Sequence, residues 1–449
     1  MNTEKPKLTR GIKIGWGIGE LAIAVYVGIT MAFFLFYLTE ALGISPVWAG
    51  TALLIPRLWD AFTDPFMGAL SDRTQSRWGR RRPYLLVGSF LFGISFWLVL
   101  SPPPFETELG RAVYFTLMYI VVSTGYTVFD VPYSSMAAEM TSDYKERVNL
   151  TGYKMMAARL GIIFAAIVSP IIYTSRDTLQ EGFALLGAIG GIFITITGLV
   201  AFFATRNAPH LDVTPERFNL RAELRAIRQN KPFASLFMVF LMQNLAIGAN
   251  ATTLIYFLTI SMKMSPNMIG PIFGVAGITA LLFTPGWVMV GKKIGKTKAY
   301  SRALMINSVV AFALFFLPPS LGMLLLGVYF INGIADAGNQ LMPNSMVPDT
   351  VEVDELQNGV RREGAIFGAW AFCRKAGMAG GAFLASILLS LFGFVSGAPE
   401  QTESASFGIR IAFSALPFVL WLTTLRLLRR YDLTEEKFNE IKANLKPGK

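Results

Sequence analysis

Long apolar segments alternate with short polar ones along almost the whole chain. Each apolar segment holds roughly the 20 residues that cross about 30 Å of hydrocarbon as an α-helix. We delimit twelve of them and predict twelve transmembrane helices, which are Trp16–Glu40, Ser45–Ser71, Pro83–Ser101, Arg111–Ala138, Leu150–Thr174, Gly182–Thr205, Pro232–Ile260, Ser265–Val290, Ala299–Pro318, Leu321–Val347, Gly364–Phe394 and Phe407–Leu428. The pattern therefore predicts an all-α membrane protein.

The polar segments differ in their content of basic residues. Alternate segments are rich in Lys and Arg, namely 73–82, 145–147, 217–231, 292–298 and 361–362. The others contain little beyond Arg111, Arg176 and Lys263. Because basic loops stay on the cytoplasmic side, we expect both termini in the cytoplasm. The first apolar segment has full spanning length and no small-residue cleavage site, so we expect an inner (plasma) membrane protein that keeps this helix.

The longest internal polar segment, residues 206–231, separates six expected spans from another six. We therefore predict an amino-terminal bundle at 1–205, a cytoplasmic connection at 206–231, a carboxy-terminal bundle at 232–428 and a tail at 429–449. The connection is either a helix on the membrane surface or a plain linker.

Two basic turns at corresponding places suggest an internal repeat. GALSDRTQSRWGRRRP follows the second span at Gly68–Pro83, and GWVMVGKKIGK ends the eighth at Gly286–Lys296. Two similar halves with a solute path between them describe the major facilitator fold. A chance match of two basic turns is the alternative.

Composition supports a membrane protein and narrows its class. Of the 449 residues, 53% are hydrophobic and only 15% are charged, against about 25% charged in soluble domains. The net charge of +11 resides in the loops, so it indicates membrane orientation and not nucleic-acid binding. The single cysteine, Cys373, excludes an intrachain disulfide, and the single histidine, His210, lies in a polar segment. With no motif for catalysis or cofactor binding, we expect neither an enzyme nor a resident cofactor.

The most informative residues are ionisable groups inside the expected spans. At the centre of a bilayer each costs about 2.5–3.5 kcal/mol, so each should line a cavity or have a partner. The first half contains Glu20, Arg57, Asp60, Asp64, Asp130, Lys154 and Arg159, and the second contains Asp336, Arg374 and Lys375.

Asp60 and Asp64 are four residues apart and so share one helix face. Two adjacent carboxylates repel each other, and either Na⁺ or a proton would relieve the repulsion. The pair therefore predicts a cation site. A structural ion pair with Arg57 or with a loop arginine is the alternative.

The other charges suggest a solute site and its coupling. A buried Lys375 requires a carboxylate partner, and a pair that a cation can displace would link the ion to the motion of the halves. Alternatively, the Lys375 side chain extends toward the lipid headgroups. Glu20, Asp130 and Lys154 can hydrogen-bond sugar hydroxyls, or they form salt bridges between helices without touching a ligand.

Several stretches carry a resemblance to a known family. RLWDAFTDPFMGALSDRTQSRWGRRRPY, GIGELA, YTVFDVPYSSMAAEMTSDYKERVNL and DTVEVDELQNGVRREGAIFGAWAFCRKAG resemble the glycoside–pentoside–hexuronide:cation symporters, the melibiose-permease group of the major facilitator superfamily. The resemblance runs through both halves of the chain.

The resemblance implies roles for particular residues. Asp60, Asp64 and Thr127 match cation ligands, with Thr63 beside them in place of an asparagine. Lys375 matches the coupling lysine. Glu20, Asp130, Lys154 and Tyr126 fall at substrate-binding positions. Two departures stand out, because Gly19 and Ser134 replace a basic residue and a sugar-stacking tryptophan of melibiose permease.

We therefore expect a Na⁺- or H⁺-coupled importer of a sugar or glycoside that works as a monomer among membrane lipids. The alternative solute is amphiphilic or anionic, such as a lysophospholipid, a uronide or a sulfonated sugar. A membrane-embedded enzyme and a receptor without transport are alternatives from other classes.

Overall fold

The computed structural model describes residues 8–141, 144–208, 230–358, 363–433, 437, 438 and 440. These residues form two compact units, one made of residues 1–218 with 396–399 and the other of residues 219–395 with 400–449. The boundary falls within the expected connection. Residues 209–229 of this connection, His210 among them, lie outside the described residues. The predicted four-part division therefore stays a prediction.

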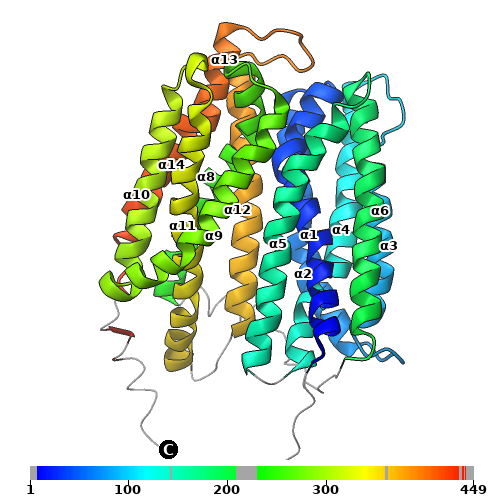
Figure 1. Cartoon of the computed structure of the whole chain (residues 1–449), viewed down its shortest axis with the longest axis vertical. Helices are drawn as coiled ribbons and strands as arrows, with labels where there is room; N and C mark the ends of the chain where they lie inside the picture. Colours follow the sequence, from blue (N-terminus) through cyan, green and yellow to red (C-terminus); the bar gives the residue numbers. More distant parts are fainter. Residues whose placement is uncertain are drawn as a thin grey trace, which may run out of the picture. The chain divides into compact units, whose positions relative to one another are not determined.

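Every predicted span corresponds to a helical segment in Figure 1. The first unit contains α1 (Arg10–Phe36), α2 (Pro46–Arg73), α3 (Arg82–Val99), α4 (Glu108–Met140), α5 (Tyr144–Tyr173) and α6 (Leu179–Thr205). The second contains α8 (Lys231–Tyr256), α9 (Ile269–Ile294), α10 (Lys296–Phe315), α11 (Leu324–Asn358), α12 (Glu363–Leu391), α13 (Glu403–Arg410) and α14 (Leu416–Leu428), the last two joined by a π-helical turn. The largest departure is α11, which continues well past the expected end at Val347.

The ends of α1 and α8 show a repeat that our sequence analysis missed. Each helix runs into a π-helical turn, Tyr37–Ala41 or Phe257–Ser261, and then into a Ser-Pro start of the next helix. Between them stands a residue with positive φ, Gly43 at 63° or Lys263 at 53°. The segments LTEALGISP and LTISMKMSP carry this geometry, so their common L-T-x₅-S-P pattern was the available signal.

Close helix packing places α4 in the first unit. Its neighbours are α2 and α3, and α3 also packs on α6. A Cβ at Gly125 would lie 2.9 Å from the Phe92 Cα, so the glycine allows α4 to approach α3 closely. Ser123 and Thr127, on either side of Gly125, donate hydrogen bonds to residues of α2.

In the second unit, α8 packs on α12 and α14, while α11 packs on α9 and α10. Polar side chains also cross this bundle, since the Gln243 amide donates to the Asn339 carbonyl oxygen at 3.1 Å and the Tyr300 hydroxyl bonds to Gln243. These bonds satisfy polar groups that lipid could not.

Within the described residues, nine helices are long and apolar enough to cross a membrane. The long helices α2, α10 and α11 are not among them, because polar residues interrupt their apolar character. The ionisable residues of α2 and α11 therefore need an explanation other than contact with lipid.

Candidate functional site

The two aspartates of α2 form matched hydrogen bonds with two hydroxyls of α4. The Ser123 hydroxyl donates to Asp60 Oδ1 at 2.5 Å, and the Thr127 hydroxyl donates to Asp64 Oδ1 at 2.7 Å. The residues are four apart on both helices, so the two contacts lie about one helical turn from each other. The Ser123 contact was missed from the sequence, although its four-residue spacing from Thr127 was the signal for it.

The two carboxylates have different surroundings. Asp60 is completely buried, and its Oδ2 lies 3.4 Å from Arg57 Nη1. Asp64 is only half-buried. The pairing of Asp60 with Arg57 that the sequence left open is therefore present, and Asp64 is the more accessible of the two acids.

Aromatic rings surround the guanidinium group of Arg57. Its Cζ lies 5.5 Å from the ring centre of Tyr119 and 5.9 Å from that of Tyr26. Tyr126 stacks on Tyr26 with ring centres 5.3 Å apart and is itself buried. The structure thus places Tyr126 in the aromatic cluster beside Arg57, and its contact with substrate stays a prediction.

Thr63 is oriented along its own helix. Its hydroxyl donates to the Trp59 carbonyl oxygen at 3.3 Å rather than to either carboxylate. Its role as a cation ligand stays a prediction.

Three of the four residues predicted to bind solute, Glu20, Asp130 and Lys154, come together, and Ser134 joins them. Lys154 Nζ on α5 donates to Ser134 Oγ at 2.7 Å and lies 3.4 Å from Glu20 Oε2 on α1. The Ser134 hydroxyl in turn donates to Asp130 Oδ1 at 2.9 Å, within α4. An ion pair therefore joins Lys154 to the Glu20 carboxylate, and Ser134 relays a hydrogen-bonded contact between Lys154 and Asp130.

Packing against Tyr133 positions this group. The Tyr133 hydroxyl donates to the Trp16 carbonyl oxygen at 2.7 Å, and the two rings stack with their centres 5.1 Å apart. A Cβ at Gly19 would lie 2.8 Å from both the Tyr133 ring and the Ala201 Cβ. The structure thus gives a reason for the absence of a basic residue at Gly19, because the space for any side chain there is already filled.

Lys375 belongs to the second unit, on α12, where it is half-buried. Its neighbour Cys373 is buried, and the Cys373 thiol contacts the Phe237 carbonyl oxygen at 3.4 Å. The coupling role of Lys375 stays a prediction.

Among the described residues, no three His, Cys, Asp or Glu side chains gather in a way that could hold a metal ion. A cation bound at Asp60 and Asp64 would need hydroxyl or carbonyl oxygens as further ligands. Hard monovalent and divalent cations accept such oxygens, and Thr127 and Ser123 supply two of them.

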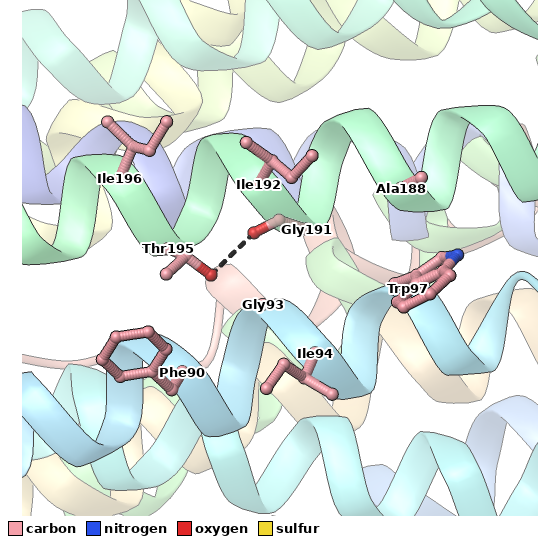
Figure 2. Close-up of a pocket in the computed structure, with 9 residues that line it drawn as sticks. All are labelled: Phe90, Gly93, Ile94, Trp97, Ala188, Gly191, Ile192, Thr195 and Ile196. Carbon is pink, nitrogen blue, oxygen red and sulfur yellow. Dashed lines mark hydrogen bonds between the residues drawn. The ribbon is translucent and has the colours of Figure 1, made fainter.

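An apolar groove of about 430 Å³ lies elsewhere, between α3 and α6 (Figure 2). Its walls are Phe90, Gly93, Ile94, Trp97, Ala188, Gly191, Ile192, Thr195 and Ile196. The Thr195 hydroxyl already donates to the Gly191 carbonyl oxygen at 2.9 Å. Because these walls contain no ionisable side chain, the groove does not suit a hydroxyl-rich solute.

Comparison with known proteins gives a consistent result over almost the whole chain. Residues 15–435 match the family described as "MFS/sugar transport protein". The "Uncharacterized symporter YnaJ" of Bacillus subtilis is 30% identical over 98% of this chain and 95% of its own length. The "Putative glycoside/cation symporter YagG" of Escherichia coli is 26% identical over 98% of this chain and 95% of its own length.

The fold is also found among solved structures. The crystal structure of the nucleoside transporter NupG matches 93% of this chain and 98% of its own with a TM-score of 0.66. At 13% sequence identity this likeness concerns the fold alone, and it confirms the predicted all-α architecture of twelve spans.

Proposed function

The chain belongs to the MFS/sugar transport protein family, and on this premise we propose that it is a cation-coupled symporter that imports a sugar or glycoside by alternating access. Membership makes it an integral membrane transporter rather than an enzyme. The coupling cation, the solute and the cytoplasmic placement of both termini in an inner membrane are parts of the proposal. The name of the glycoside/cation symporter among its relatives supports the cation coupling and the class of solute.

The observation that carries the proposal is the pair of carboxylate–hydroxyl contacts between α2 and α4. Asp60, Asp64 and Arg57 together bear one net negative charge, which one monovalent cation would neutralise. The Thr127 and Ser123 hydroxyls each keep oxygen lone pairs that can turn toward a bound ion. A proton on Asp64 would remove the same charge, so the site suits Na⁺, Li⁺ or H⁺.

Asp64 is the residue at which a cation would bind first. It is half-buried and is not the acid that pairs with the guanidinium group, whereas Asp60 is buried and ion-paired. Removing the negative charge of Asp64 should therefore abolish coupling while the Asp60–Arg57 ion pair stays in place.

The proposed solute site is the group formed by Glu20, Asp130 and Lys154. Carboxylates accept and an ammonium donates hydrogen bonds, so together they can bind the hydroxyls of a sugar. Both proposed sites include residues of α4. Ser123 and Thr127 contact the α2 aspartates. Asp130 and Ser134 of the solute site lie about one and two helical turns beyond Thr127. This helix is a physical connection between cation and solute.

Thermodynamic linkage requires that each of the two ligands raises the affinity for the other by the same factor. If cation binding raises the affinity for solute by some factor, solute raises the affinity for the cation by the same factor. In this proposal Lys375 is the coupling residue, and bundle rearrangement would carry both ligands across.

Thermal stability of the purified protein tests this function. We would measure the melting temperature in detergent with and without Na⁺, across panels of sugars and lysolipids, for the wild type and for Asp64→Asn. Stabilisation by Na⁺ that increases with one sugar and disappears in Asp64→Asn supports the proposal. Stabilisation by a lysolipid alone would instead favour the amphiphilic alternative.

Uptake into proteoliposomes gives the second readout. A Na⁺ or H⁺ gradient should drive uphill uptake of the stabilising sugar by the wild type and not by Asp64→Asn. Unchanged uphill uptake by the variant would refute the cation site, and binding without flux would indicate a receptor.

A further inference from the structure

Two packed helices of the second unit carry a group of exposed basic side chains at one end. α10 and α14 pack against each other, as Figure 1 shows. The first turns of α10 and the last turn of α14, with the two residues after it, contribute five exposed cations, which are Lys298, Arg302, Arg426, Arg429 and Arg430. Neither the cation site nor the solute site proposed above includes any of them.

α10 and α14 run in opposite directions, so the start of one lies beside the end of the other. The guanidinium group of Arg410, which precedes α14, donates to the carbonyl oxygen of Leu317, just after α10, at 2.8 Å. Further into both helices, Phe312 of α10 and Phe418 of α14 have ring centres 5.3 Å apart. From the first contact to the second, residue numbers fall along α10 and rise along α14, as antiparallel packing requires.

The cations of the two helices lie at one level of the second unit. Arg302 is ten residues from Phe312, the α10 partner in the ring contact. Arg426 and Arg430 are eight and twelve residues from Phe418, the α14 partner. At 1.5 Å per residue the first separation is about 15 Å, and the other two are about 12 Å and about 18 Å. These guanidinium groups therefore lie at the same height on neighbouring helices.

Lys298 and Arg302 begin the side of α10 that is suited to lipid. After them, every third or fourth residue on this side is exposed and apolar, in the series Met305, Val309 and Phe312. Residues at such intervals share one helix face. One continuous face of α10 therefore presents two cations in its first turns and apolar side chains beyond them, which is the order of a lipid headgroup and its acyl chains.

The exposed face of α14 has the same order. Val419 is 57% exposed, and Arg426 follows it by seven residues, which returns to the same side of the helix two turns further on. Arg430 follows Arg426 by another four residues. An arginine side chain is long enough to extend its charged end to the headgroup region from a position within the last turn of a transmembrane helix.

The acidic side chains at this end are already paired with other lysines. Asp349 pairs with Lys296 at 2.7 Å, and Asp432 pairs with Lys437 at 3.2 Å. Within the parts of the chain that the structure describes, no acidic side chain forms an ion pair with any of the five cations. Five neighbouring positive charges without a carboxylate partner repel one another and attract an anion.

Membrane orientation by itself does not account for this arrangement. The positive-inside rule requires only that basic residues lie in the loops on one side. Arg302 and Arg426 lie within helices, at one height and on faces that continue into apolar side chains. The matching ligand is therefore amphiphilic, with an anionic end and an apolar chain. Groups of about four to eight basic residues beside a transmembrane helix are typical of sites for anionic lipids.

We propose that the exposed cations of α10 and α14 bind the headgroup of an anionic phospholipid, whose phosphate pairs with Arg302 and Arg426 while its acyl chains follow the apolar side of α10. Guanidinium groups suit this role because they bind phosphate oxygens through two parallel hydrogen bonds. The proposed orientation places this end of the second unit at the cytoplasmic leaflet, where anionic lipids reside. The inference goes beyond the proposed transport function and takes only this orientation from it.

Titration with lipid tests the site. Melting temperatures of the purified protein in detergent would be measured over a series of concentrations of phosphatidylglycerol, or of phosphatidylcholine with the same acyl chains. Phosphatidylglycerol should stabilise the wild type at lower concentrations than phosphatidylcholine. Arg302→Gln/Arg426→Gln should raise the half-saturating concentration of phosphatidylglycerol about tenfold and leave that of phosphatidylcholine unchanged. Equal effects of the two lipids on the wild type would overturn the proposal.

Two control variants separate a defined site from overall charge. Arg302→Lys/Arg426→Lys keeps both charges and should bind phosphatidylglycerol more tightly than the glutamine variant. Arg73→Gln/Arg206→Gln removes two exposed cations from the ends of α2 and α6 in the first unit, and its half-saturation should equal that of the wild type. If this variant lost as much affinity as Arg302→Gln/Arg426→Gln, only the total charge would matter and the α10–α14 site would be refuted.

The outcomes also separate this inference from the proposed function. If no sugar stabilises the wild type but phosphatidylglycerol does so through Arg302 and Arg426, the lipid site stands and the proposed solute is wrong. If Na⁺ and a sugar stabilise the wild type while phosphatidylglycerol acts no better than phosphatidylcholine, the transport function stands and the lipid site is refuted.

Discussion

Thr127 donates its hydroxyl hydrogen to Asp64 at 2.7 Å, between the middle parts of α4 and α2. One turn away, Ser123 makes the corresponding contact with Asp60. Hydrogen bonds to charged groups are worth about 1.5–3 kcal/mol, so these hydroxyls both orient the carboxylates and offset their repulsion. The contacts give the proposed cation site a defined geometry, and several consequences can be measured.

Loss of the Thr127 hydroxyl should weaken cation binding. We expect Thr127→Val to raise the half-saturating Na⁺ concentration about tenfold, equivalent to about 1.4 kcal/mol. Thr127→Ser keeps the hydroxyl and should stay near the wild type. Melting temperatures measured over a Na⁺ titration give both values, and equal values for Val and Ser would exclude a role for the hydroxyl.

Neutralising Asp60 should affect stability as well as coupling. Asp60→Asn leaves the guanidinium group of Arg57 without its ion-pair partner inside the protein, which costs about 3–5 kcal/mol in the free energy of unfolding. Asp64→Asn leaves that pair intact and should destabilise much less in the absence of Na⁺.

The double variant Arg57→Gln/Asp60→Asn provides the control. It removes both charges, so it should recover part of the melting temperature lost in Asp60→Asn. If the loss of melting temperature in the double variant equalled the sum of the losses in Arg57→Gln and Asp60→Asn, the ion pair would contribute nothing to stability.

Gly19 should not tolerate a side chain. Gly19→Ala places its Cβ 2.8 Å from both the Tyr133 ring and the Ala201 Cβ, so a lower melting temperature and weaker sugar binding are expected. Gly11→Ala in the same helix is the matched control, because its Cβ would meet nothing closer than 4.0 Å. If both variants had the same melting temperature, the close contact of α1 with Tyr133 and Ala201 would not restrict the side chain at Gly19.

Glu146, which precedes the fifth span, should make stability depend on pH. Burial raises the pKa of Glu146, but the hydrogen bond from Lys13 and those from the Leu8 backbone N–H and Thr141 outweigh it, so the pKa falls below its ordinary value of 4.5. The Lys13 Nζ lies 3.0 Å from its Oε1. A lowered carboxyl pKa stabilises the fold above the unfolded value, and this stabilisation is lost as the pH falls through the folded value.

The comparison with Glu146→Gln measures this effect. The wild type should melt at a higher temperature than the variant at pH 7, and the difference should shrink steadily below about pH 4.5. A difference that is the same at pH 7 and below pH 4 would mean that the carboxylate charge is not responsible.

The alternation of apolar and polar segments predicted the spans, because a bilayer requires each crossing helix to satisfy its own backbone and to be largely apolar. It did so even for α2, α10 and α11, whose apolar character polar residues interrupt. The sequence also identified Asp60 and Asp64 as a pair, since residues four apart on a helix must be neighbours. Glu20, Asp130 and Lys154 were recognised because charges inside spans are costly. The sequence pattern did not reveal that α11 ends at Asn358, because the last part of this helix lies beyond the apolar segment.

Tertiary structure decided which polar groups meet. Ser123 and Thr127 reach the α2 aspartates only because Gly125 brings α4 against α3 with the hydroxyls on the other side. Packing of α5 against α4 joined Lys154 to Ser134, and the Thr63 hydroxyl instead bonds within its own helix. Spacing along a chain fixes neighbours within a helix, whereas partners between helices depend on packing and rotation, which no single segment encodes.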